Sequence, residues 1–219
     1  MIYTQEAIII KTSDFSETDK LVSLISKEKG YIKSIAKGAR KPTSKKTSHI
    51  DLGVCAKFHL ATGKNFDVIT EVVPVWAPEG IKLSLEKAGI MYFILELCEK
   101  FFRQTEQGSE IYSDLLFVLT ELEKNNELAH NLKLLVIFES RLLHKTGFLR
   151  NITDVESMTK QEIRNYKIIK FIVENTFEDA LRLKLNEDDI QNILEELYNQ
   201  IVEILEREPK SYKFLKSLM

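Results

Sequence analysis

The spacing of apolar residues changes once along this chain of 219 residues, near Ile81, and that change limits the possible folds more than any other feature. Before it, short apolar runs alternate with polar turns, which is typical of β-strands; after it, apolar residues recur every three or four positions, which is typical of amphipathic helices. Pro74 and Pro78 close the strand-like part. The sequence therefore predicts an α+β protein with two domains, at 1–79 and 80–219.

The first domain contains five strand-like runs separated by turn residues. They cover 7–10, 21–25, 31–36, 52–60 and 66–73. Five strands within about 75 residues indicate a small closed sheet. Five is the number of strands in an OB-fold barrel, which often binds single-stranded nucleic acid, but other barrels have the same number. The strand number alone therefore leaves the type of barrel open.

The second domain is predicted to be entirely helical. Ser109 is a candidate N-cap, and Thr159 with Glu162 fits a capping box. Gly147 and Pro209 are residues at which helices are expected to stop. Apolar residues at helical spacing define segments at 90–101, 111–122, 128–143, 163–172 and 190–205, and a short final helix is expected at 211–219.

Residues 33–46, with the sequence KSIAKGARKPTSKK, combine a high positive charge with the absence of any acid. The segment begins as a strand and then breaks at Gly38 and Pro42 into a polar loop, and Pro42 argues against a helix. A loop with this charge repels itself unless an anion lies near, and the nucleic-acid backbone is the commonest large anion in a cell. A solvated hairpin loop explains the charge equally well. The cations are Lys33, Lys37, Arg40, Lys41, Lys45 and Lys46.

The formal net charge of −2 hides an uneven distribution. Residues 1–80 carry 12 Lys and Arg against 9 Asp and Glu, a net charge of +3, and the remaining 19 cations and 24 acids give −5. Such a division suggests two units with different partners. In the basic part, Lys11 and Lys20 extend the cationic surface beyond the loop, and Lys33, Lys37 and Arg40 could follow phosphates.

Three aromatic residues in the basic part could stack on bases: Phe15, Tyr31 and Phe66. Each also has a purely structural interpretation. Phe66 lies on an alternating strand and is expected in the barrel core. Tyr31 is consistent with core or edge packing, and Phe15 lies in a polar turn as either a plug or a surface ring.

Motifs for catalysis or metal binding are lacking in the sequence. The histidines are dispersed, and Cys55 and Cys98 have apolar neighbours typical of buried free thiols in a reducing cytoplasm. Asp14, Glu17 and Asp19 are close enough in sequence to raise the alternative of a Mg²⁺-dependent nuclease. No apolar run approaches the length of a membrane span, so a cytoplasmic protein without membrane contact is expected.

With these residues identified, the chain resembles the RecO family of bacterial DNA repair and recombination mediators. The similar segments span nearly the whole chain and occur in the same order as in the family. It is carried by AIIIKT and DFSETDKLV at 7–12 and 14–22, GYIKSIAKGARKP at 30–42, FESRLLHKTGFL at 138–149 and LKSLM at 215–219.

The resemblance implies an N-terminal OB barrel followed by a helical domain, and a non-enzymatic protein without a cofactor. It further implies binding of single- and double-stranded DNA, annealing of complementary strands, and loading of the recombinase onto strands coated by single-stranded DNA-binding protein. The implied partners are a RecR-type mediator protein and the acidic C-terminal tail of the single-stranded DNA-binding protein, in the cytoplasm and associated with the nucleoid. A protein adaptor whose OB domain does not bind DNA is the alternative.

Carried onto this sequence, the resemblance makes Lys37, Arg40 and Lys41 the foremost DNA contacts. It makes Arg141 a candidate for the acidic tail, with Phe138 or Leu142 lining an apolar slot. Many relatives carry a four-cysteine zinc site after the Gly-Phe-Leu segment, whereas residues 150–154 of this chain contain no cysteine. We therefore expect no zinc, and metal analysis that finds one stoichiometric zinc ion would contradict this.

Overall fold

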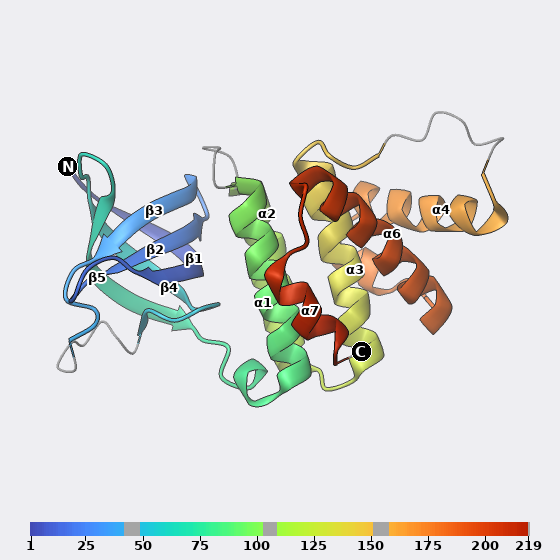
Figure 1. Cartoon of the computed structure of the whole chain (residues 1–219), viewed down its shortest axis with the longest axis horizontal. Helices are drawn as coiled ribbons and strands as arrows, with labels where there is room; N and C mark the ends of the chain where they lie inside the picture. Colours follow the sequence, from blue (N-terminus) through green and yellow to red (C-terminus); the bar gives the residue numbers. More distant parts are fainter. Residues whose placement is uncertain (42–48, 103–108, 151–157, 219) are drawn as a thin grey trace.

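The structure, a computed structural model, describes residues 1–41, 49–102, 109–150 and 158–218. A small β-barrel forms one end of the molecule and a group of helices forms the other (Figure 1). The predicted α+β class, with five strands before the helices, is confirmed. The predicted division between 79 and 80 falls between the last strand and the first short helix.

The barrel has the topology of an OB fold. Its strands close in the order β1-β2-β3-β5-β4, and every pair is antiparallel except β3 with β5. This arrangement identifies the type of barrel that the strand number left open. The strands are β1 (Ile2–Asp14), β2 (Lys20–Ser26), β3 (Gly30–Ala36), β4 (Cys55–Ala61) and β5 (Asp67–Trp76).

Strand β1 is buried on both faces, which explains why its apolar residues are consecutive. Side chains of a strand alternate between its two faces. Ala7 and Ile9 point into the barrel core, whereas Ile8 and Ile10 belong to the core shared with the helices. A strand that separates two apolar layers needs no polar face. The strand extends well beyond the predicted 7–10 at both ends. The sequence prediction missed these ends because they carry exposed polar side chains and lack the apolar pattern.

The helices follow the predicted segments, and one of the two predicted N-terminal caps is present. Thr159 and Glu162 form the predicted capping box, and Asn186 forms another with Asp189. Ser109 is the first helical residue rather than the cap. The elements are η2 (Ile81–Leu83), α1 (Leu85–Phe102), α2 (Ser109–Lys124), α3 (Leu128–Lys145), α4 (Lys160–Glu174), α5 (Phe177–Leu181), α6 (Glu187–Leu205) and α7 (Lys210–Lys216).

One helix end and one short helix depart from the sequence prediction. Helix α6 ends at Leu205 because Glu206 adopts the left-handed conformation, with φ of 53°, so the prediction that Pro209 ends it is wrong. Pro209 instead precedes α7, a position that its fixed φ and missing N–H suit. The short helix α5 was not predicted, since five residues are too few for a periodic pattern.

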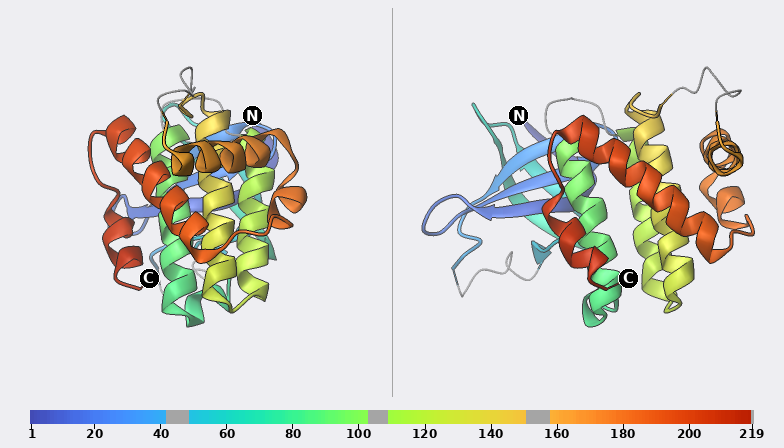
Figure 2. Two further views of the ribbon diagram at one scale, coloured as in Figure 1. Left: turned by 90° about the vertical axis from the view of Figure 1, so that its right-hand side faces the viewer. Right: turned by 45° about the vertical axis from the view of Figure 1, so that its right-hand side comes forward.

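Helix α1 joins the barrel to the remaining helices. It lies between the barrel and α3, with α7 along another side (Figures 1 and 2). Its buried residues share one apolar core with Ile8, Ile25 and Cys55 of the barrel. The barrel and the helices are therefore packed together rather than joined only by a linker. Within the described ranges, none of the helices has the length and apolar character needed to cross a membrane.

We predict that Gly53→Ala destabilises the protein more than Gly147→Ala does. Both glycines have positive φ, 78° and 75°, so both substitutions introduce backbone strain of about 1–2 kcal/mol. A Cβ on Gly53 would also lie 2.9 Å from Met91 Sδ and 3.0 Å from Pro78 Cγ, whereas nothing lies within 4 Å at Gly147. Overpacking adds about 1–3 kcal/mol to the cost at Gly53. Urea denaturation measures both, and equal losses would contradict close packing at the junction.

Candidate nucleic-acid interface

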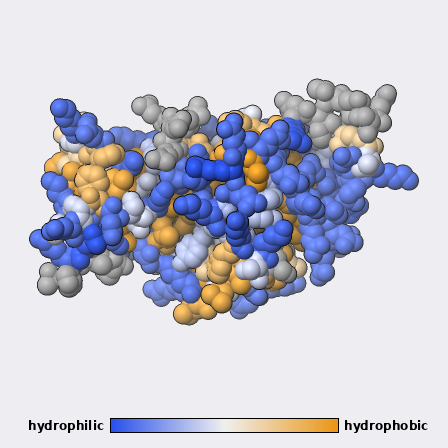
Figure 3. Space-filling view, viewed as in Figure 1, coloured by the Kyte–Doolittle hydropathy of each residue, from blue (hydrophilic) through white to orange (hydrophobic). Residues whose placement is uncertain are grey.

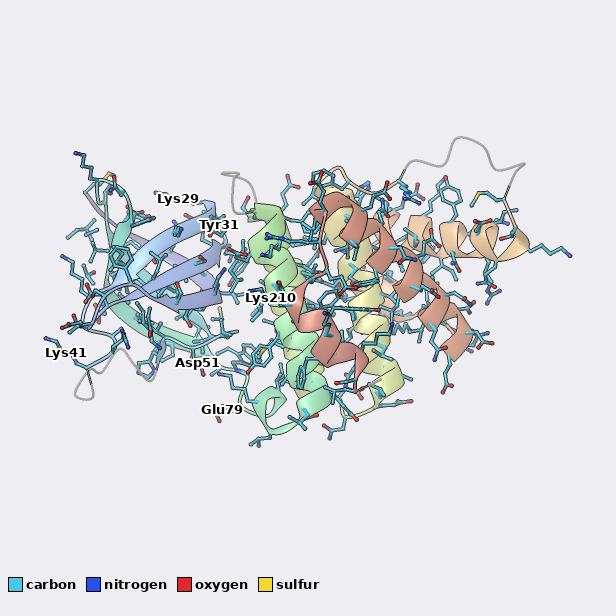
Figure 4. All side chains as sticks on the ribbon, in the orientation of Figure 1. Lys29, Tyr31, Lys41, Asp51, Glu79 and Lys210 are labelled. Atoms are coloured by element: carbon cyan, nitrogen blue, oxygen red, sulfur yellow. The ribbon has the colours of Figure 1, made fainter. Side chains whose placement is uncertain are left out.

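Three connecting segments meet at one end of the barrel. Strand β1 ends where β2 begins, with Asp14 opposite Lys20, and Lys20 lies opposite Ala36 at the end of β3. The start of β5 lies beside the end of β3, with Asp67 opposite Ser34. We call this end, formed by residues 15–19, 37–41 and 62–66, the loop end of the barrel. Lys41 marks it in Figure 4, on the side away from the helices.

The loop end gathers five of the residues predicted to bind DNA. Lys37, Arg40 and Lys41 are exposed, Lys20 is partly buried at the start of β2, and Lys33 is partly buried in the middle of β3 with its Nζ over the Phe66 ring. Their side chains therefore place positive charge at this end of the barrel, and contacts from such charges to phosphates do not depend on the base sequence. Lys45 and Lys46, also predicted to bind DNA, lie outside the residues that the structure describes.

Lys11 is the exception among the predicted DNA contacts. Its Nζ lies 3.1 Å from Oε1 of Glu99, a buried carboxylate on α1. This ion pair bridges the barrel and the helical domain. Lys11 therefore has a structural role at the junction, and the structure does not group it with the loop end.

Arg40 is bound to its own chain. One guanidinium nitrogen lies 3.1 Å from Oδ2 of Asp14, and another donates a hydrogen bond of 2.7 Å to the carbonyl of Ser16. Its backbone N–H donates to the carbonyl of Thr18 at 2.9 Å. The side chain is 37% exposed. Part of the positive charge that was predicted to contact DNA is thus neutralised within the barrel.

A second contact joins the same two segments. Oδ1 of Asp19 accepts a hydrogen bond of 2.9 Å from the Gly38 N–H, and Gly38 has a φ of 68° that favours glycine. This hydrogen bond, the Thr18 hydroxyl and the charge of Lys37 keep the pKa of Asp19 below its ordinary value. Asp19 therefore stays ionised at neutral pH as an acceptor within the turn.

Two aromatic rings also meet at the loop end. The rings of Phe15 and Phe66 are 6.0 Å apart and nearly perpendicular, and Lys33 Nζ lies 5.1 Å from the centre of the Phe66 ring. Phe15 is a surface ring, 50% exposed. The prediction that Phe66 belongs to the barrel core is wrong, because the ring precedes β5 and packs against Phe15. Tyr31 packs against the helical core instead.

The residues predicted to bind a partner protein are part of the helical core. Phe138 and Leu142 have no exposed surface. Arg141 donates two hydrogen bonds to the carboxylate of Asp114 and one of 2.7 Å to the carbonyl of Asn175. The structure contradicts the prediction of an apolar slot for the acidic tail, because Phe138 and Leu142 are inaccessible and Arg141 is already paired. Sequence periodicity placed them on one helix face but could not tell which neighbour covers it.

Between these residues lies a buried acid, Glu139 of α3. It is 1% exposed, and its Oε2 has no hydrogen-bond partner. Burial raises its pKa well above the ordinary value, since desolvation disfavours the charged form. The carboxyl group is therefore a structural feature of the core rather than an anionic ligand.

We predict that Glu139→Gln changes the pH dependence of stability. The folded protein keeps Glu139 protonated at pH values where the unfolded chain ionises it, so the contribution of Glu139 to the free energy of unfolding falls as pH rises above about 4.3. Glutamine does not titrate. The free energy of unfolding of the variant should therefore rise relative to that of the wild type by up to about 1.4 kcal/mol per pH unit, until the pH reaches the pKa of Glu139 in the folded protein. Denaturation at several pH values measures this, and a difference independent of pH would contradict it.

The described residues contain no group of three or more His, Cys, Asp or Glu side chains able to hold a metal ion. Asp14 and Asp19, two of the three acids of the nuclease alternative, are engaged with Arg40 and Gly38 instead. Both cysteines are buried free thiols. Residues 151–154, part of the segment on which the expectation of no zinc rests, lie outside the described residues, so that expectation stays a prediction.

Comparison with known proteins gives a consistent result along the chain. Family models described as Recombination protein O N terminal and Recombination protein O C terminal match residues 1–77 and 83–161. A DNA repair protein RecO from Dehalococcoides mccartyi is 26% identical over 99% of this chain and 96% of its own length. Another, from Roseiflexus sp., is 31% identical over 67% of this chain and 50% of its own length.

Proposed function

Because the chain belongs to the RecO family of DNA repair proteins, we propose that it is a recombination mediator that binds DNA at the loop end of its barrel. The observation that carries this proposal is the group of lysines there, Lys33, Lys37 and Lys41, on an OB barrel. The mediator acts without covalent chemistry. Its role is to bring complementary single strands together and to help load the recombinase onto coated strands.

Electrostatics provides the mechanism of annealing. Two strands repel each other through their phosphates, and a cationic surface reduces this repulsion while it releases condensed counterions. Flexible lysine side chains suit this role, because they contact phosphates without reading the base sequence. Single- and double-stranded DNA are both ligands of such a surface.

Protein partners are assigned to the helical domain. The proposed partners are a RecR-type mediator protein and the acidic C-terminal tail of the single-stranded DNA-binding protein. Leu83 and Leu85, next to the start of α1, are exposed, and Figure 3 shows apolar surface in this part of the molecule. An exposed apolar surface supports contact with proteins. The buried residues around Arg141 have no part in it.

We predict that the triple substitution Lys33→Glu, Lys37→Glu and Lys41→Glu weakens DNA binding regardless of sequence. The plot of log affinity against log salt should also flatten, by about 0.7 for each phosphate of a single strand that the variant no longer neutralises. The matched control reverses Lys160, Lys167 and Lys184, three exposed lysines on and near α4 at the opposite end of the molecule. Fluorescence anisotropy across a salt series measures both variants.

The control separates a local site from a general charge effect. Both variants change the net charge equally, so equal losses of affinity would exclude a site at the loop end. Unchanged affinity and an unchanged salt slope in the Lys33, Lys37 and Lys41 variant would also exclude a site at the loop end. Failure of the wild type to bind DNA at low and moderate salt would favour a protein adaptor instead.

Annealing of coated strands tests the mediator role itself. We predict that the protein accelerates annealing of complementary strands coated by single-stranded DNA-binding protein, and that removal of that protein's acidic tail reduces the effect. The control is annealing of uncoated strands, which should not depend on the tail. Equal rates with and without the tail on coated strands would contradict the proposed partner.

A further inference from the structure

The two loops that carry Phe15 and Phe66 are held in fixed shapes. Arg40 contributes a guanidinium hydrogen bond to Ser16, an ion pair to Asp14 and a backbone hydrogen bond to Thr18. Its partners therefore lie on both sides of Phe15, and the loop cannot move without breaking them. These contacts hold the loop in one conformation, and they leave the Arg40 guanidinium engaged rather than free.

The loop that carries Phe66 is restrained from the other side. Asp67 accepts hydrogen bonds from the Gly63 N–H, at 3.2 Å, and from the Tyr3 hydroxyl on β1. A Cβ on Gly63 would lie 2.0 Å from the carbonyl oxygen of Phe66, so only glycine fits this turn. Both rings are thus presented by loops that the barrel holds in place.

The Phe15 ring needs an explanation because it is half exposed in a polar loop. The ring keeps half of its surface exposed at the loop end while its edge-to-face contact joins it to Phe66, and Lys33 Nζ lies over the Phe66 ring. A ring with a lysine beside it offers a stacking surface for a base and a charge for the adjoining phosphate. Bases in a duplex are already stacked and paired, so this surface favours a strand whose bases are free.

We propose that Phe15 and Phe66 form a stacking platform for an unpaired base of a single strand, and that Arg40 is a positioning residue that holds Phe15 in place rather than a phosphate ligand. This inference rests on the proposed function and specifies single-stranded nucleic acid as the ligand of the loop end. Arg40 was predicted from its charge as a DNA contact. Its interactions on its own chain assign it the different role.

The first experiment compares a deoxythymidine oligonucleotide with an abasic oligonucleotide of equal length. Phe15→Ala and Phe66→Ala should each weaken binding of the first by about 5- to 150-fold, the range for loss of one stacked base. Binding of the abasic strand and of duplex should change less than twofold, and the salt slope should be unchanged. Phe171→Ala, which removes another exposed ring on α4, is the matched control.

The second experiment separates positioning from phosphate binding at Arg40. Arg40→Lys keeps the charge but loses the planar fork that bonds Ser16 and Asp14 together. A positioning role predicts that Arg40→Lys and Arg40→Ala both weaken thymidine-strand binding with the salt slope unchanged. It also predicts that Arg40→Ala has little further effect in a Phe15→Ala background. A phosphate ligand would instead give a lysine variant like the wild type and an alanine variant with a flatter slope.

These outcomes distinguish the inference from the function on which it rests. If the wild type binds DNA but both phenylalanine variants bind the thymidine strand as it does, the stacking platform is wrong and the proposed function stands. Additive effects of Arg40→Ala and Phe15→Ala would overturn the positioning role. If the wild type binds no DNA, both proposals fail. Thermal unfolding of each variant establishes that the comparison is between folded proteins.

Discussion

The two-sided burial of β1 is the interaction on which the rest of the structure depends. Ala7 and Ile9 fill the barrel, while Ile8 and Ile10 pack against the helices, so a single strand belongs to two apolar cores. Separating the two domains would expose the second set to water, at a cost of about 25 cal/mol for each Å² of apolar surface. The barrel is therefore fixed on the helical domain, with its loop end on the side away from the helices (Figure 4).

Polar contacts complete this junction without driving it. Lys11 pairs with the buried Glu99, and the hydroxyl of Tyr112 donates a hydrogen bond of 2.9 Å to Glu6 on β1. Buried charges need partners, because an unpaired one is costly to desolvate. The same rule applies to Arg141 in the helical core and, more loosely, to Arg40 at the barrel surface. Lys11, Arg141 and Arg40 were each predicted from the sequence to contact a ligand. In the structure each one pairs with groups of its own chain.

Several features could be predicted because they depend on local chemistry. Strands and helices followed from the spacing of apolar residues, and the capping box at Thr159 followed from a four-residue pattern. The candidate site was predicted less completely. The lysines at the loop end were identified from charge, but the positions of Phe66 and Arg141 were not, because no local pattern records which segment covers a given side chain.

The sequence by itself determined the α+β class, the order of strands and helices and the basic segment after β3, since periodicity and composition are properties of neighbouring residues. The tertiary structure alone decided which residues meet across the barrel. It brought Phe15 beside Phe66, although about 50 positions separate them, and it turned Arg40 from a free cation into a partner of Asp14. Pairing between distant strands sets these contacts, and their register depends on the packing of the whole barrel.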